Sequence, residues 1–123
     1  MDKNKLNNIA LSISEKPKGI LAADESTGTI TKRFDQIKFE SNFENRRKYR
    51  ELLFTSKDIE NFISGVILYD ETIRQNDING VPFINLLKTK NIHPGIKVDG
   101  GVTALVGSET EKITEVWITL RKE

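Results

Sequence analysis

A short apolar run that ends abruptly on an acid is the feature that most constrains the fold of this chain. Residues 20–23 read Ile-Leu-Ala-Ala, follow Pro17 and Gly19, and give way directly to Asp24. An apolar run of this length between turn residues is typical of a strand that is buried on both faces, as in a parallel sheet. Because ligands gather at the carboxyl ends of parallel strands, Asp24 is a candidate site residue.

Two further apolar runs repeat this pattern. Residues 63–68 are followed closely by the acids Asp70 and Glu71, and residues 95–98 are followed by Asp99. Apolar residues at helical spacing predict helices between and before these strands, at about residues 6–13, 30–37, 43–54 and 83–87. The alternation of strand, polar loop and helix predicts an α/β fold with parallel strands and right-handed crossovers.

The last segment of the chain carries a second helical pattern. Ile113, Val116, Trp117 and Leu120 recur at helical spacing, which predicts a terminal helix with an apolar stripe.

Composition narrows the class of protein. The 123 residues suffice for one domain, and a net charge of +1 gives no bulk electrostatic reason to expect nucleic acid or an anionic membrane as a partner. Cysteine is absent and histidine occurs once, so we expect no disulfides and no metal site built from thiolates or from several histidines. No cofactor is expected either. No apolar run approaches the roughly 20 residues that span a bilayer, and Met1–Lys5 has no apolar stretch behind it, so we expect no signal peptide. We therefore expect a cytoplasmic protein.

Four motifs resemble the class I fructose-bisphosphate aldolases, in the order in which that family carries them. They are GILAADEST at residues 19–27, ENRRKYRELL at 44–53, SGVILYDET at 64–72 and GIKVD at 95–99. The resemblance covers residues 18–114 and implies one partial domain over residues 1–123, with a divergent end at 115–123. It implies an incomplete (β/α)8 TIM barrel, made of roughly the first three β/α units behind an N-terminal helix.

The resemblance also implies an activity and a set of site residues. The family is a glycolytic lyase that cleaves fructose 1,6-bisphosphate to dihydroxyacetone phosphate and glyceraldehyde 3-phosphate through a lysine Schiff base, without a metal. Asp24 matches the family's catalytic aspartate on the first strand. Thr29, Arg33 and Lys97 match positions that contact substrate phosphate. The family is homo-oligomeric, and open strand edges predict that this chain self-associates.

Each of these residues also has a plainer interpretation. Asp24 is equally consistent with a loop acid or a helix cap, and Arg33 with a solvated helix residue. Lys97 is more informative, because a lysine within an apolar strand must find a partner or shift its pKa. The alternative function is a noncatalytic α/β module that binds a phosphate ester or associates with an aldolase.

The end of the chain departs from the family pattern. Where the family has Gly-Leu-Asp, this chain has Val116, Trp117 and Ile118, and a one-base slip from GGT TTG GAT gives the same Val-Trp pair. We expect a frameshift near Glu115; the alternatives are chance agreement of these residues and a natural or recombinant fragment. The resemblance implies that the Schiff-base lysine lies on a strand this chain does not carry, which predicts an inactive chain.

Overall fold

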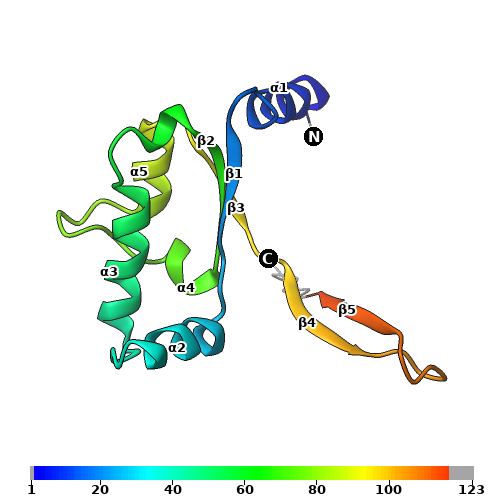
Figure 1. The fold of residues 1–123 in the computed structure, drawn as a ribbon. Coiled ribbons are helices and arrows are strands. Elements are labelled where there is room, and N and C mark those ends of the chain that lie inside the picture. The colour runs from blue at the N-terminus through cyan, green and yellow to red at the C-terminus, as the bar shows by residue number, and fades with distance from the viewer. Residues whose placement is uncertain (1, 117–123) are drawn as a thin grey trace, which may run out of the picture.

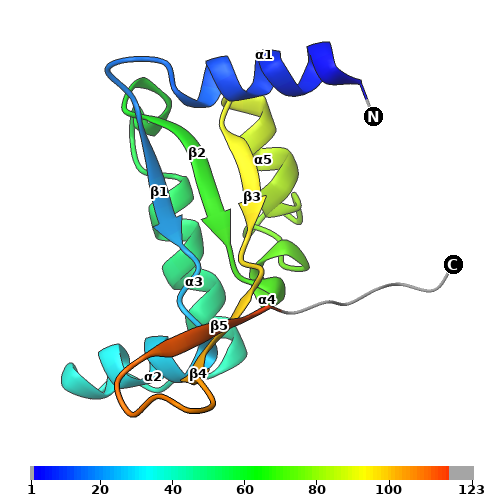
Figure 2. The same cartoon turned by 90° about the vertical axis from the view of Figure 1, so that its right-hand side faces the viewer.

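Three parallel strands form the centre of the structure, a computed structural model that describes residues 2–116. The strand order is β1-β2-β3 (Figures 1 and 2). In chain order the elements are α1 (Lys3–Ile13), β1 (Gly19–Ala23), α2 (Thr27–Gln36), α3 (Phe43–Phe54), a 3-10 turn (Ile59–Asn61), β2 (Ile63–Leu68), α4 (Asp70–Ile73), α5 (Phe83–Thr89), β3 (His93–Ile96), β4 (Asp99–Ala104) and β5 (Lys112–Val116). The predicted α/β class with three parallel strands is confirmed; three strands do not close a barrel.

Within residues 2–116, the packed layer of helices lies on one face of this sheet. Figure 1 shows α3, α4 and α5 on one side, α1 beyond the amino ends of the strands and α2 near their carboxyl ends. Side chains alternate between the faces of a strand, and the register aligns Leu21 with Val66 and Ala23 with Leu68. These rows point into the helix layer, since Ala23, Val66 and Leu68 are fully or almost fully buried.

The core lies between the sheet and the helix layer. Phe54 of α3 and Phe83 of α5 are both 0% exposed and meet edge to face, with ring centroids 5.2 Å apart. Each fully buried side chain of this size contributes about 1.5–3 kcal/mol through removal of apolar surface from water. The core cluster comprises Ala23, Phe54, Ile59, Val66, Leu68, Phe83, Leu87 and Ile92.

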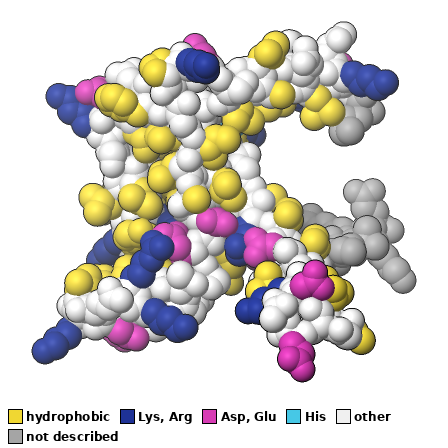
Figure 3. Space-filling model, turned by 45° about the vertical axis from the view of Figure 1, so that its right-hand side comes forward, with side chains coloured by type: hydrophobic (Ala, Val, Ile, Leu, Met, Phe, Trp, Pro, Cys, Tyr) yellow, Lys and Arg dark blue, Asp and Glu magenta, His cyan; other side chains and the backbone are white. Residues whose placement is uncertain are grey.

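The alternate rows face the other way and remain open. Ile20 pairs with Gly65 and Ala22 pairs with Ile67; Ile20 is 55% exposed and Ala22 is also exposed. Figure 3 shows hydrophobic side chains along this face, between α1 above and the β4–β5 hairpin below. We call this surface the open face.

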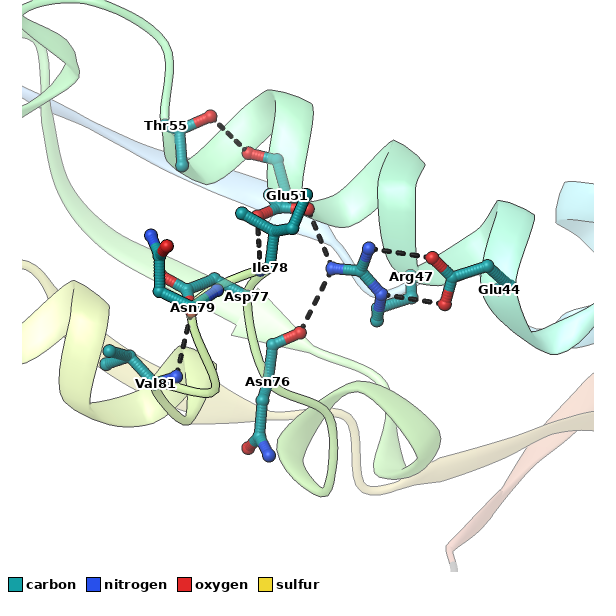
Figure 4. Close-up of polar contacts among 9 residues, drawn as sticks. All are labelled: Glu44, Arg47, Glu51, Thr55, Asn76, Asp77, Ile78, Asn79 and Val81. Atoms are coloured by element: carbon teal, nitrogen blue, oxygen red, sulfur yellow. Dashed lines mark hydrogen bonds and ion pairs between the residues drawn. The ribbon is translucent and has the colours of Figure 1, made fainter.

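A polar network attaches the loop between α4 and α5 to helix α3. The Arg47 guanidinium donates to Glu44, to Glu51 and to the backbone oxygen of Asn76, and Glu51 also accepts from the backbone N–H of Ile78 at 2.7 Å (Figure 4). The two carboxylates raise the pKa of Arg47 far above its ordinary value. The loop is thereby tied to a helix of the covered face.

The predicted terminal helix is wrong over the described residues. Lys112–Val116 forms β5, which pairs antiparallel with β4, Asp99–Ala104. Residues that branch at Cβ, among them Val102, Thr103 and Ile113, are stiff at χ1 and suit a strand better than a helix. Two apolar residues at helical spacing were too few to decide the period, and Trp117 and Leu120 lie outside the described residues.

The third strand also begins earlier than the sequence indicates. It covers His93–Ile96, so Lys97 and Val98 follow the strand. The pairing with β2 nevertheless continues for one step, because the Lys97 N–H donates to the Leu68 oxygen at 2.8 Å. This places Lys97 at the carboxyl end of the sheet.

Candidate functional site

The carboxyl end of the sheet brings Asp24 and Lys97 together across 73 positions of sequence. Lys97 Nζ lies 3.4 Å from Asp24 Oδ2 and 2.7 Å from Asp99 Oδ1. Asp24 directly follows β1 and Lys97 directly follows β3, and by alternation both continue rows of the open face. The ammonium therefore sits between two carboxylates, with about a quarter of its side chain still exposed.

This arrangement fixes the charge of the lysine. The hydrogen bond to Asp99 and the charges of Asp24 and Asp99 raise the pKa of Lys97 above its ordinary value, against the opposing effect of desolvation. The same hydrogen bond from Lys97 lowers the pKa of Asp99. Lys97 is accordingly a cation at neutral pH, suited to holding an anionic group in place rather than to attacking a carbonyl as a free amine.

A second cluster begins one residue after Asp24. One carboxylate oxygen of Glu25 accepts from Arg33 of α2 and the other accepts from Arg50 of α3. Arg50 also donates to the backbone oxygen of Glu25 at 2.8 Å. Burial alone would raise the pKa of Glu25, but the hydrogen bond from Arg50 and the two positive charges lower it overall.

Thr29 lies in the first turn of α2. Ser26 caps this helix by accepting from the Thr29 N–H at 3.3 Å, and the two hydroxyls lie 3.1 Å apart. A helix start that carries two hydroxyls favours an anion, because the helix dipole is positive at this end. The structure thus brings Asp24 and Lys97 into direct contact, and places Thr29 and Arg33 on the helix that follows.

A cleft of about 600 Å³ opens beside Lys97. Its walls come from Tyr69, from Asp70 and Arg74 at the two ends of α4, and from the segment between Ile96 and Asp99. Figure 3 shows acidic and basic side chains gathered at this end of the open face, next to the hairpin. The cleft leaves Lys97 accessible to a small molecule.

The two acids after β2 begin α4 rather than simply ending a strand. Glu71 accepts a paired contact from Arg46 of α3, at 2.8 and 2.9 Å, and Asp70 pairs with Arg74 one helical turn away. Both acids are therefore engaged in structural ion pairs.

Three residues of the site were not predicted from the sequence. Asp99 was recognised as the end of a strand, yet its spacing of two from Lys97 was a usable signal, since such residues share a side of an extended segment. Glu25 and Arg50 gave no signal, because they are 25 positions apart and meet only when α3 packs near the end of β1.

Two further features bear on the class of protein. Within residues 2–116, no group of three or more histidine, aspartate or glutamate side chains is arranged to hold a metal ion. Over the same residues, no helix has both the length and the apolar character that crossing a membrane demands.

Fold and site together define a parallel α/β chain with an acid–lysine contact at the carboxyl end of its sheet. The family model for class-I fructose-bisphosphate aldolase matches residues 5–122. The chain is 53% identical over 113 residues to fructose-bisphosphate aldolase 2 of Caenorhabditis elegans and 52% identical over 114 residues to fructose-bisphosphate aldolase C-A of Danio rerio. It belongs to the class-I fructose-bisphosphate aldolase family.

A solved structure agrees with this assignment. Fructose-bisphosphate aldolase from Plasmodium falciparum, in a complex with TRAP and a small molecule inhibitor, superposes with a TM-score of 0.87 at 50% identity. Each of these matches covers 92% of this chain. The chain in turn spans 31% of the length of the two relatives and 33% of the solved chain.

Proposed function

We propose that this chain provides the first three strand units of a class I fructose-bisphosphate aldolase barrel. These units carry the catalytic aspartate and part of the phosphate-binding site. The observation that carries the proposal is the contact of Lys97 with Asp24 and Asp99 at the carboxyl ends of β1 and β3. Active sites of (β/α)8 barrels are built at this end of the strands.

The proposed substrate is fructose 1,6-bisphosphate, and each residue has a role its geometry suits. Asp24 is the catalytic aspartate beside the reacting sugar, where its carboxylate can orient a substrate hydroxyl and a neighbouring ammonium. Lys97, Thr29 and Arg33 bind phosphate: Lys97 as a point charge, Thr29 through its hydroxyl and Arg33 through paired N–H donors.

The Schiff-base step needs a nucleophile from outside these strands. A lysine that forms a Schiff base must lose its proton before it attacks the ketone. The raised pKa of Lys97 opposes that loss, so Lys97 is unsuited to this role. We therefore propose that the chain alone does not turn over, and that the activity of the family, which reversibly forms dihydroxyacetone phosphate and glyceraldehyde 3-phosphate, requires further strands. We further propose that the chain acts in the cytoplasm, as part of a homo-oligomeric enzyme or self-associated.

One observation favours a second candidate, a noncatalytic phosphate-ester-binding or aldolase-associating module. The cations at this end of the sheet, Lys97 and Arg33, are both paired with carboxylates. Such groups bind anions without needing a nucleophile. Binding of phosphate esters by a folded, monomeric chain would favour this module over an incomplete enzyme.

An aldol-cleavage assay on the purified chain with fructose 1,6-bisphosphate tests the proposal, combined with borohydride trapping read by intact mass. We expect no turnover and no trapped adduct, with a full-length relative as the positive control. Turnover with an adduct would overturn the assignment and identify a resident lysine as nucleophile.

Two lysine variants locate any adduct. Lys97→Met removes the site lysine, and Lys90→Met is the matched control. Lys90 is similarly exposed, at 25% against 24%, and is likewise paired with a carboxylate, but it lies after α5, away from the carboxyl end of the sheet. An adduct that only Lys97→Met abolishes would assign the covalent step to Lys97.

A further inference from the structure

Glu25 is shared between two arginines that differ in burial. The Arg50 side chain is 3% exposed and Arg33 is 55% exposed, and each takes one oxygen of the same carboxylate. Arg50 holds Glu25 twice, through the side chain and through the backbone oxygen at 2.8 Å. Arg33 has a single contact among the described hydrogen bonds, and that contact is Glu25.

The two contacts therefore differ in how readily they exchange. Separating Glu25 from Arg50 would leave a buried guanidinium without its counter-ion, which is strongly unfavourable. Separating Glu25 from Arg33 returns an exposed guanidinium to water, where ion pairs of this kind are weak. Any ligand that draws Arg33 away leaves Glu25 still paired with Arg50.

We propose that Glu25 is a built-in competitor for Arg33, which a phosphate ester must displace and which a simple carboxylate cannot. This inference rests on the proposed function, in which Arg33 binds substrate phosphate. Glu25 occupies Arg33 as an internal carboxylate, already held in position by Arg50. A free carboxylate offers no greater charge and must lose its own freedom to compete. A phosphate ester offers nearly two charges and three acceptor oxygens, so it makes the stronger charge-assisted contact.

Glu25 is thus a specificity residue for the class of anion. With Glu25 present, the site discriminates phosphate from carboxylate by the difference in strength of the two contacts to Arg33. Without the Glu25 charge, Arg33 is open to both classes, and the discrimination decreases. Arg50 has the positioning role, since it keeps Glu25 at the end of β1 whether or not Arg33 is engaged.

A double-mutant cycle tests the competition, with inorganic phosphate and acetate as probes and chemical-shift titration of the full chain as the readout. Glu25→Gln keeps the size of the side chain and an acceptor for Arg50 but removes the charge. We expect it to tighten phosphate binding by about two- to fivefold, the range expected when one exposed ion pair no longer competes. Acetate binding should tighten by a larger factor, so that the preference for phosphate falls.

The Arg33→Ala background separates competition from a general field effect. In that background Glu25→Gln should have no effect on phosphate, since there is no longer an arginine to compete for. Asp35→Asn is the matched control, because it removes an exposed carboxylate from the same helix, two residues from Arg33. A tightening by Glu25→Gln that persists without Arg33, or that Asp35→Asn reproduces, would overturn the inference.

The outcomes also separate this inference from the proposed function. If phosphate binding is lost in Arg33→Ala and in Lys97→Met but unchanged in Glu25→Gln, the competition is refuted. The proposed phosphate-binding role of Arg33 and Lys97 is then supported. If neither Arg33→Ala nor Lys97→Met changes phosphate binding, the proposed phosphate-binding site is refuted, and the competition is refuted as well.

A measurement on the unmodified chain keeps the test decisive if Glu25→Gln does not fold. Saturating phosphate should shift the guanidinium NMR signals of Arg33 and leave those of Arg50 in place. Movement of both arginines, or of neither, would contradict the exchange of partners.

Discussion

The two faces of the three-stranded sheet have opposite characters, although they alternate along the same few residues. On the covered face, Val66 and Leu68 are sealed under Phe54, Phe83 and neighbouring helix residues. On the open face, Ile20 and Ala22 of β1 remain exposed. The covered face supplies the packing that stabilises this part of the fold. The rows of the open face continue into the charged side chains that form the site.

This division explains why the site lies where it does. Asp24 and Lys97 continue the open rows one step beyond β1 and β3, so their side chains avoid the apolar helix layer. A charge placed on a covered row would instead require costly desolvation. Stability and site chemistry can therefore be perturbed separately.

The largest expected contrast is between a core truncation and an open-face truncation. Phe54→Ala should lower the free energy of unfolding by about 3–5 kcal/mol, because it opens a cavity against Phe83. Ile20→Ala should lower it by less than about 1 kcal/mol, since half of Ile20 is already in water. Urea unfolding of both variants measures the difference. Equal losses would mean that the open face is buried in solution, for example by self-association.

The next effect concerns the polar network on the outer side of the covered face. Arg47→Met should destabilise the chain by about 1–2 kcal/mol, since it breaks charge-assisted contacts to Glu51 and to the loop at Asn76. Hydrogen exchange should accelerate at the Ile78 amide, which Glu51 holds. Lys48→Met, on an exposed position of the same helix, is the control and should leave both quantities unchanged. Unaltered exchange at Ile78 in Arg47→Met would show that Arg47 is not needed to hold the loop.

A smaller effect is expected where α1 meets the sheet. None of the residues of α1 is buried, and Ser64 of β2 donates from its hydroxyl to the Ile13 oxygen at 2.6 Å. Ser64→Ala should cost about 1 kcal/mol, because a buried hydrogen bond is lost and the Ile13 oxygen loses a partner. The loss should appear as faster amide exchange in α1 with little change in α3. Faster exchange in both helices would indicate that α1 supports the covered face as well.

The least effect on stability, with a clear spectroscopic sign, is expected at Lys97. Its pKa in the folded chain lies above the ordinary 10.5, so its stabilisation is present below that value and is lost as the pH rises through the folded pKa. The pKa of Asp99 lies below the ordinary 3.8, so its contribution is present above that value and is lost as the pH falls through the folded pKa. Asp99→Asn should therefore lower the pKa of Lys97, as measured by NMR titration of its side chain. An unchanged Lys97 titration would mean that this contact does not persist in solution.

Local sequence was sufficient for the first two strands and for the position of Asp24. The apolar runs at residues 20–23 and 63–68 correspond closely to β1 and β2, because a strand buried within a sheet requires apolar side chains without polar alternation. The abrupt change to Asp24 fixed the end of the first strand for the same reason. The spacing of apolar residues gave the wrong prediction at residues 112–116, because a few apolar residues there were consistent with both a helix and a strand.

Contacts between distant segments were decided by the tertiary structure alone. Lys97 contacts Asp24, 73 positions away, and Glu25 is held by Arg50, 25 positions away. No local pattern records such a pair, because a polar residue near a strand end or on a helix looks the same whether it faces water or a partner. The sequence by itself determined the first two strands of the sheet and the position of its polar ends. The alignment of β1, β2 and β3, together with the packing of α2 and α3 near the end of β1, determined which charges meet there.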